Sequence, residues 1–140
     1  MYALGFTGTR SGMTSVQRNV VANFLLQQRS FITEAHHGDC IGADAEFDEE
    51  CLRLEVPRVI HPPVSDVYRA NRQRFGISIV CPPKEYLERD VDIVIVTNIL
   101  LAAPKGEEIN RSVTWHTIRC ARKEGRLIYI VYPDGGLVCE

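Results

Sequence analysis

The first group of residues that could bind a ligand lies close to the N-terminus. Thr9, Arg10 and Ser11 stand between Gly8 and Gly12, after a short apolar stretch and before a predicted helix. Hydroxyl and guanidinium groups donate hydrogen bonds to phosphate oxygens, and a helix N-terminus favours an anion because its first N–H groups are unpaired. This loop is therefore predicted to bind the phosphate of a nucleotide-like ligand. The alternative is a tight turn that leaves Arg10 in solvent.

A second loop of small and acidic residues follows the next predicted strand. Its candidate ligand-binding residues are Gly38, Asp39, Gly42, Ala43 and Asp44. The two glycines would let the backbone approach a ligand closely, and the two carboxylates could accept hydrogen bonds from sugar hydroxyls or from a base. Asp44 could instead lie in the first turn of a helix, where its charge favours the helix dipole.

A third polar loop runs from residue 97 to residue 111, and a helix begins at its end. The candidate ligand-binding residues in this region are Thr97, Lys105, Arg111, Ser112 and Thr114. Arg111 and Ser112 stand beside the helix start, which makes a second place for an anion. The alternative is a solvent-exposed loop with a charged end. If the protein is an enzyme, its catalytic carboxylate is expected to be Glu108 or Asp44, since the first loop holds no general base.

The glycines of the first loop do not match two common nucleotide-binding motifs. Gly8 and Gly12 form Gly-x-x-x-Gly, whereas dinucleotide-binding domains use Gly-x-Gly-x-x-Gly and P-loops end in Gly-Lys-Ser or Gly-Lys-Thr. The sequence therefore disfavours a dinucleotide-dependent dehydrogenase and a P-loop nucleoside triphosphatase. No cofactor is predicted.

Five strands and four helices are predicted to position these loops. The strands are predicted at residues 2–7, 30–35, 56–61, 91–96 and 127–132. The helices are predicted at residues 14–28, 43–54, 84–90 and 111–124. Thr14 and Gln17 have the spacing of a capping box at the start of the first helix. Strands that alternate with helices indicate an α/β domain with a mainly parallel sheet of about five strands and helices on both faces.

The strand signal is strongest at residues 91–96, whose β-branched side chains suit a central parallel strand covered on both faces. In an open parallel sheet, ligands bind beyond the carboxyl ends of the strands. Each of the three candidate loops follows a predicted strand. We therefore expect the loops to meet at one edge of the sheet.

Length and composition are typical of one globular domain that covers residues 1–140. The chain has 45% hydrophobic and 24% charged residues, and no apolar segment reaches the roughly 18 residues that could span a bilayer. A formal net charge of −2 argues against nucleic acid or an anionic membrane as a partner. The basic cluster of Arg69, Arg72 and Arg74 lies in a polar, irregular segment that is predicted to be a functional loop.

The cysteines and histidines give no metal motif. The five cysteines form no Cys-x-x-Cys pair, so they are predicted to be reduced thiols in a cytoplasmic protein. His36 and His37 would point to opposite sides of a strand, which argues against a shared ion, and no metal site is predicted. Trp115, the only tryptophan, is assigned to the core, with stacking on a base as the alternative.

The three loops together resemble those of the SLOG superfamily, which includes DNA-processing protein A, the cytokinin-activating LOG proteins and the YspA/YpsA-like families. The resemblance rests on residues 5–14 (GFTGTRSGMT), 37–44 (HGDCIGAD), 92–96 (DIVIV), 103–106 (APKG) and 111–122 (RSVTWHTIRCAR). It covers nearly the whole chain and implies a single Rossmann-like domain that binds a nucleotide or nucleotide-derived ligand at these loops. A homodimer or larger homo-oligomer, common among such relatives, is implied as well.

The sequence departs from the LOG enzymes at the position of their catalytic glutamate. Those enzymes carry Pro-Gly-Gly-x-Gly-Thr-x-x-Glu, and if Thr114 stands for the threonine of that pattern, Thr117 takes the place of the glutamate. We therefore expect binding of a nucleotide-like small molecule, for sensing or sequestration. The alternatives are an N-glycosidase or phosphoribohydrolase of nucleoside monophosphates and, with less support, a single-stranded DNA-binding module.

Overall fold

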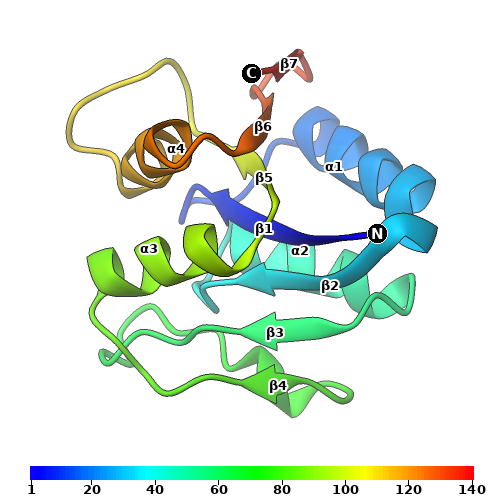
Figure 1. Ribbon diagram of the computed structural model, residues 1–140, viewed down its shortest axis with the longest axis vertical. Helices are drawn as coiled ribbons and strands as arrows, with labels where there is room; N and C mark the ends of the chain where they lie inside the picture. The colour runs from blue at the N-terminus through cyan, green and yellow to red at the C-terminus, as the bar shows by residue number, and fades with distance from the viewer.

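A seven-stranded sheet forms the centre of the computed structural model, which describes residues 1–140 (Figure 1). Its strands are β1 (Tyr2–Gly8), β2 (Ile32–His37), β3 (Arg58–Ile60), β4 (Ile79–Val80), β5 (Ile99–Ala103), β6 (Leu127–Val131) and β7 (Leu137–Cys139). Their order is β4-β3-β2-β1-β5-β6-β7, and every neighbouring pair is parallel except β6 and β7. The mainly parallel sheet predicted from the sequence is confirmed, with two additional short strands at its edges.

The direction in which the sheet grows reverses at β1. The strands β2, β3 and β4 lie on one side of β1, whereas β5, β6 and β7 lie on the other. In sheets of this kind a crevice forms beyond the carboxyl ends of the strands at the point of reversal. The loops that follow β1 and β5 flank this point, so the fold itself indicates where a ligand would bind.

Helices cover both faces of the sheet, as predicted. One face carries α1 (Ser15–Gln28) and α2 (Ala43–Arg53), and the other carries α3 (Tyr86–Val96) and α4 (Val113–Lys123) (Figure 1). Successive side chains of β5 point to opposite faces of the sheet, so this strand contributes to the core on both faces. Leu101 and Ala103 join the core under α1 and α2, and Leu100 and Ala102 join the core under α4. Two single-turn 3₁₀ helices, η1 (Arg29–Phe31) and η2 (Arg72–Arg74), lie in connecting segments.

The start of α1 is joined directly to the sheet. Thr14 and Gln17 form the predicted capping box, in which the Gln17 N–H donates to Thr14 Oγ1 at 3.0 Å and the Thr14 N–H donates to Gln17 Oε1 at 3.2 Å. Gln17 Nε2 also donates to the carbonyls of Pro104, at 2.9 Å, and of Val131, at 2.8 Å. The first loop is therefore positioned relative to the ends of β5 and β6.

The predicted strand at residues 91–96 is wrong: these residues form the second half of α3. The buried positions are Arg89, Asp90, Ile93 and Val94, a helical spacing, while the β-branched Val91 and Ile95 lie on the solvent side. Their β-propensity is overridden because the helix already begins at Tyr86 and buries one face against α4 and β1. The strand that pairs with β1 on this side of the sheet is instead β5, within the segment that the sequence reading assigned to the third loop.

None of the helices is both long enough and apolar enough to cross a membrane. Trp115 lies in the core, as expected, with its indole N–H donating to the Gly106 carbonyl at 3.2 Å. Ile118 is buried as well, whereas Val113 is exposed on the surface of α4. The homo-oligomer implied by the sequence stays a prediction.

Candidate functional site

A cavity of about 280 Å³ opens beyond the carboxyl ends of the central strands. The end of β1 with the first loop, and the second loop with the start of α2, contribute to its lining Phe6, Thr7, Gly8, Thr9, Arg10, Gly38, Cys40 and Asp44. The helix α3 contributes Tyr86, Arg89, Asp90 and Ile93, and the third loop with the start of α4 contributes Lys105, Ile109, Arg111, Ser112, Val113 and Thr114. The three loops predicted from the sequence therefore meet around one cavity, together with α3, whose first part was predicted as the helix at residues 84–90 but was not assigned to the site.

Most of the predicted ligand-binding residues line this cavity. They are Gly8, Thr9, Arg10, Gly38, Asp44, Lys105, Arg111, Ser112 and Thr114. The others, which do not line it, are Ser11, Asp39, Gly42, Ala43 and Thr97. These five residues make contacts within the protein instead.

Gly42 and Ala43 hold the second loop against the first. The Ala43 N–H donates to the Thr9 carbonyl at 3.0 Å. Gly42 has a φ of +87°, and a Cβ at this position would lie 2.2 Å from the Arg10 carbonyl oxygen, so no other residue fits. Ser11 is exposed, and its hydroxyl is 2.8 Å from that of Thr9. These contacts fix the backbone that carries Arg10 into the cavity.

Thr97 lies at the opposite end of β5 from the cavity. It is the residue at which α3 ends, and its hydroxyl donates to the Ile93 carbonyl at 2.7 Å. The sequence reading placed Thr97 beyond a strand because residues 91–96 were predicted as that strand. With the strand shifted to β5, the loop beyond its carboxyl end begins at Pro104 instead.

Glu108, one of the two candidate catalytic carboxylates, does not line the cavity. Its carboxylate pairs with Arg119 Nη1 at 3.1 Å and with Arg122 Nη1 at 3.0 Å on the outer surface of α4. Asp44, the other candidate, does line the cavity. Thr117 is fully buried, and its hydroxyl donates to the Val113 carbonyl at 3.1 Å. Asp44 is therefore the only predicted catalytic carboxylate that faces the site.

Three cationic side chains line the cavity without an acidic partner. Arg10, Lys105 and Arg111 take part in none of the ion pairs of the structure, and Arg10 lies over the Tyr68 ring at 4.0 Å. The helix α4 begins at the same wall, with Ser112 as its N-cap. The N–H groups of Val113 and Thr114, in its first turn, donate to no protein acceptor. Unpaired cations beside a helix N-terminus make this wall suited to an anion.

Arg89 and Asp90 form the part of the site that sequence reasoning missed. Arg89 Nη1 donates to the Gly38 carbonyl at 2.6 Å, and its Nε donates to Asp90 Oδ1 at 2.8 Å. A Cβ at position 38 would lie 2.6 Å from the Arg89 guanidinium carbon, so a larger residue than glycine would displace this guanidinium. The sequence carries no motif for this pair, because only the packing of α3 shows that these two charged residues are buried.

Burial changes the protonation of the groups at the inner end of the cavity. Burial raises the pKa of Asp44 against the opposing effect of His37 and Arg89, and it raises the pKa of Asp90 against that of Arg89. Burial and the Asp44 charge raise the pKa of the Cys40 thiol to about 11, so this thiol is protonated at pH 7. For Arg89, burial lowers the pKa, but Asp90 and Asp44 outweigh this effect and the guanidinium stays charged.

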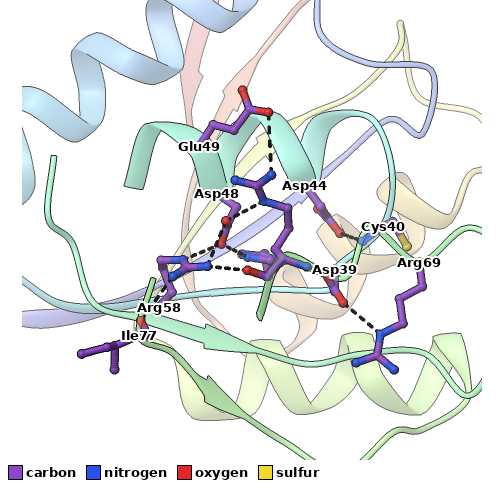
Figure 2. Close-up of polar contacts among 10 residues, drawn as sticks. Asp39, Cys40, Asp44, Asp48, Glu49, Arg58, Arg69 and Ile77 are labelled. Carbon is purple, nitrogen blue, oxygen red and sulfur yellow. Dashed lines mark hydrogen bonds and ion pairs between the residues drawn. The ribbon is translucent and has the colours of Figure 1, made fainter. Parts of the chain in front are cut away.

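A buried ionic network holds the segment between β3 and β4 in place (Figure 2). Asp48 on α2 is fully buried and accepts from Arg58 Nε and Arg72 Nε, both at 2.8 Å. Asp39, also fully buried, accepts from Arg69 Nε at 3.1 Å and from the backbone N–H of Arg72 at 2.8 Å. Two of the three arginines in the predicted functional loop are therefore occupied within the protein.

No family model and no curated protein sequence matches this chain. Its fold, however, is similar to that of solved structures. DNA processing protein A from Streptococcus pneumoniae superposes with a TM-score of 0.74 at 16% sequence identity, over 91% of this chain and 49% of that one. The same protein from Helicobacter pylori, described as binding single-stranded DNA, gives a TM-score of 0.69 at 13% identity, over 91% of this chain and 64% of that one.

The molybdenum cofactor carrier protein from Chlamydomonas reinhardtii also has a TM-score of 0.69, at 13% identity, over 91% of this chain and 74% of that one. Of the S. pneumoniae protein described above, this chain spans about half the length. Identities this low show a common fold and nothing finer. The resemblance to DNA-processing protein A that the loops indicated is confirmed at the level of a single Rossmann-like α/β fold.

Proposed function

We propose that this protein binds a nucleotide or a nucleotide-derived small molecule in the cavity beyond β1 and β5, for sensing or sequestration. The observation that carries the proposal is that three cations without an acidic partner, Arg10, Lys105 and Arg111, line the same cavity as the N-terminus of α4. The cationic side chains would attract a phosphate by charge, and the first backbone N–H groups of α4 would donate hydrogen bonds to it. The first loop, with Thr9, would add a hydroxyl donor.

The size of the cavity also supports a small ligand. About 280 Å³ lies near the lower end of the range for small-molecule sites, which suits a mononucleotide better than a dinucleotide. The solved structures of similar fold include a carrier protein for the molybdenum cofactor and a protein that binds single-stranded DNA. A single cavity of this volume suits a small-molecule ligand better than an extended polymer.

Calorimetry against mononucleotides, cyclic nucleotides and ADP-ribose derivatives tests the proposal. We expect Arg111→Ala to weaken binding about tenfold or more, since a hydrogen bond to a charged group contributes about 1.5–3 kcal/mol. Lys123→Ala, at the other end of α4 and outside the cavity, is the matched control and should bind like the wild type. A folded wild-type sample that binds none of these compounds below millimolar concentration would contradict the proposal.

Hydrolysis of the ligand is the second candidate function, and Asp44 is the observation that favours it. This carboxylate lines the cavity, and burial raises its pKa, as is useful for a general acid. Chromatography after incubation with nucleoside monophosphates would detect a released base. If a base is released, Asp44→Asn should abolish the release. Intact nucleotides after long incubation at high protein concentration would contradict hydrolysis, and binding would remain as the proposed function.

A further inference from the structure

The two ends of the cavity carry opposite charge. Arg10, Lys105 and Arg111 are exposed at its open side. Asp44 and Asp90 line its inner side, where their exposed fractions are only 6% and 4%. Arg89 lies beside these two carboxylates and balances only one of their charges. A ligand that fits both ends therefore needs an anionic group at one end and a group of the opposite character at the other.

Two oxygen atoms at the inner end have no hydrogen-bond partner. Asp90 Oδ1 accepts from Arg89 Nε at 2.8 Å, whereas Asp90 Oδ2 is buried and has no donor within hydrogen-bond geometry. The Thr117 hydroxyl lies near this carboxylate and acts to lower its pKa, but it donates its proton to the Val113 carbonyl at 3.1 Å. The hydroxyl of Tyr86, one turn earlier on α3, is also buried and unpartnered. Both residues line the cavity. A buried polar atom without a partner is destabilising, and most such atoms in proteins are hydrogen-bonded, so two of them beside one cavity need an explanation.

The chemistry of these two atoms defines the group that would satisfy them. An ionised carboxylate oxygen only accepts hydrogen bonds, whereas a phenol hydroxyl donates and accepts. A partner for both must therefore donate to Asp90 and accept from Tyr86. A sugar hydroxyl does both with one atom, and an amino group beside a ring nitrogen does both along the edge of a base. A second phosphate or a carboxylate would be repelled by Asp44 and Asp90.

We infer that Tyr86 and Asp90 select the ligand by binding a paired donor and acceptor, a sugar hydroxyl or the amine edge of a base, at the end opposite its phosphate. This inference rests on the proposed function, because the cationic wall must hold the phosphate for the inner end to be reached. The helix α3 sets the position of both residues. Tyr86 and Asp90 are four residues apart and thus on the same face of the helix.

Binding to matched pairs of probes tests the inference and separates the two sources of the donor. Three pairs of probes differ in a base amine: AMP and IMP, CMP and UMP, and GMP and XMP. The 2′-deoxy and 3′-deoxy forms of the best binder test the sugar hydroxyls. Pyrophosphate tests the cationic side chains alone. The proteins are the wild type, Tyr86→Phe, Asp90→Asn and Arg111→Ala. Glu88→Gln, on the exposed side of α3, is the matched control.

We expect Tyr86→Phe and Asp90→Asn to weaken the best nucleotide about tenfold and to leave pyrophosphate binding unchanged, while Arg111→Ala weakens both. If the wild type discriminates by the base amine, the amine edge is bound; if it discriminates between ribo and deoxy forms, a sugar hydroxyl is bound. Tyr86→Phe removes only an oxygen without a partner and keeps the ring that lies 5.2 Å from the Arg89 guanidinium, so this variant should fold like the wild type. If Asp90→Asn also displaces Arg89, the Tyr86→Phe variant alone decides the test.

Two outcomes would overturn the inference, and they differ. If Tyr86→Phe binds every nucleotide as tightly as the wild type while Arg111→Ala does not, the selection by α3 is wrong and the proposed function stands. If the wild type binds neither a nucleotide nor pyrophosphate, the proposed function fails and the inference fails with it.

Discussion

At the scale of single residues, the first loop depends on a glycine that no other residue can replace. Gly42 has a φ of +87°, and a Cβ there would lie 2.2 Å from the Arg10 carbonyl oxygen. We expect Gly42→Ala to lower the free energy of unfolding by about 1–3 kcal/mol, since both the backbone conformation and the contact are strained. Urea denaturation measures this change, and ligand affinity should fall as well because Arg10 moves.

Gly106→Ala is the control for that substitution, in the third loop of the same site. Gly106 has no positive φ, and no atom lies within 4 Å of the added Cβ. Its free energy of unfolding should stay within about 0.5 kcal/mol of the wild type. Equal stability of the two alanine variants would show that the two loops do not need their close backbone contact.

A pair of buried histidines predicts how stability depends on pH. His36 Nε2 bonds Glu34 Oε1 at 3.0 Å, and since a carboxylate only accepts, His36 Nδ1 is left to accept from His61 Nε2 at 2.8 Å. Burial, with the neighbouring His36, lowers the pKa of His61 to about 4, and burial also lowers that of His36. Both rings are therefore neutral at pH 7 in the folded protein.

The sign of the pH effect follows from these directions. In the unfolded chain both histidines take up a proton near pH 6.5, which the folded protein resists. The resulting stabilisation is complete above pH 6.5 and is lost as the pH falls toward 4. Urea denaturation between pH 7 and pH 4 should show a steeper loss in the wild type than in His61→Gln. Parallel curves for the two proteins would contradict the assignment of a neutral His61.

At the scale of elements, one buried carboxylate joins α2 to β3 and to the segment before β4. Asp48 accepts from Arg58 and Arg72, and its Oδ1 lies 2.7 Å from His37 Nε2 (Figure 2). These contacts, with burial opposing them, hold its pKa well below the usual range. Asp48→Asn should lower the free energy of unfolding by about 3 kcal/mol, because it leaves buried cations without a counter-charge.

Glu50→Gln, on the same helix, provides the comparison. Glu50 is partly buried and pairs at 3.2 Å with Arg53, whose guanidinium is exposed, so solvent screens the pair and it contributes about 0–1 kcal/mol. Urea denaturation should therefore show a change several times smaller than that of Asp48→Asn. A similar loss in both variants would mean that the buried network adds no more than a surface ion pair.

The elements also show what the sequence could and could not predict. The capping box at Thr14 and the helix at residues 43–54 were predictable because both depend on neighbours within one turn. The helix predicted at residues 84–90 forms the first part of α3, but its continuation to Val96 was not predictable, since Val91 to Val96 favour a strand locally and only their packing against α4 and β1 decides otherwise. The prediction of the site was incomplete for the same reason. Arg10 and Arg111 were identified from their loops, whereas Arg89 and Asp90 were identified only from the structure.

At the scale of the whole molecule, the charge distribution separates a small ligand from a polymer. The formal net charge is −2, and the basic cluster of the sequence is neutralised from within, with Arg69 on Asp39 and Arg72 on Asp48. Only Arg74 of this cluster has no acidic partner, and it lies 5.4 Å from the Phe75 ring. The unpaired cations that remain line a local cavity of about 280 Å³ and do not continue as a basic surface along which a polymer could lie.

We therefore expect no specific binding of single-stranded DNA, in contrast to the H. pylori protein of similar fold. Fluorescence anisotropy with a labelled oligonucleotide at physiological salt should give a Kd no tighter than about 10⁻⁵ M, within the non-specific range. Weak binding seen at low salt should disappear with added salt, because few phosphates can be contacted at once. Submicromolar binding that Arg74→Ala weakens, and that a mononucleotide does not compete away, would contradict this expectation and place a polymer site outside the cavity.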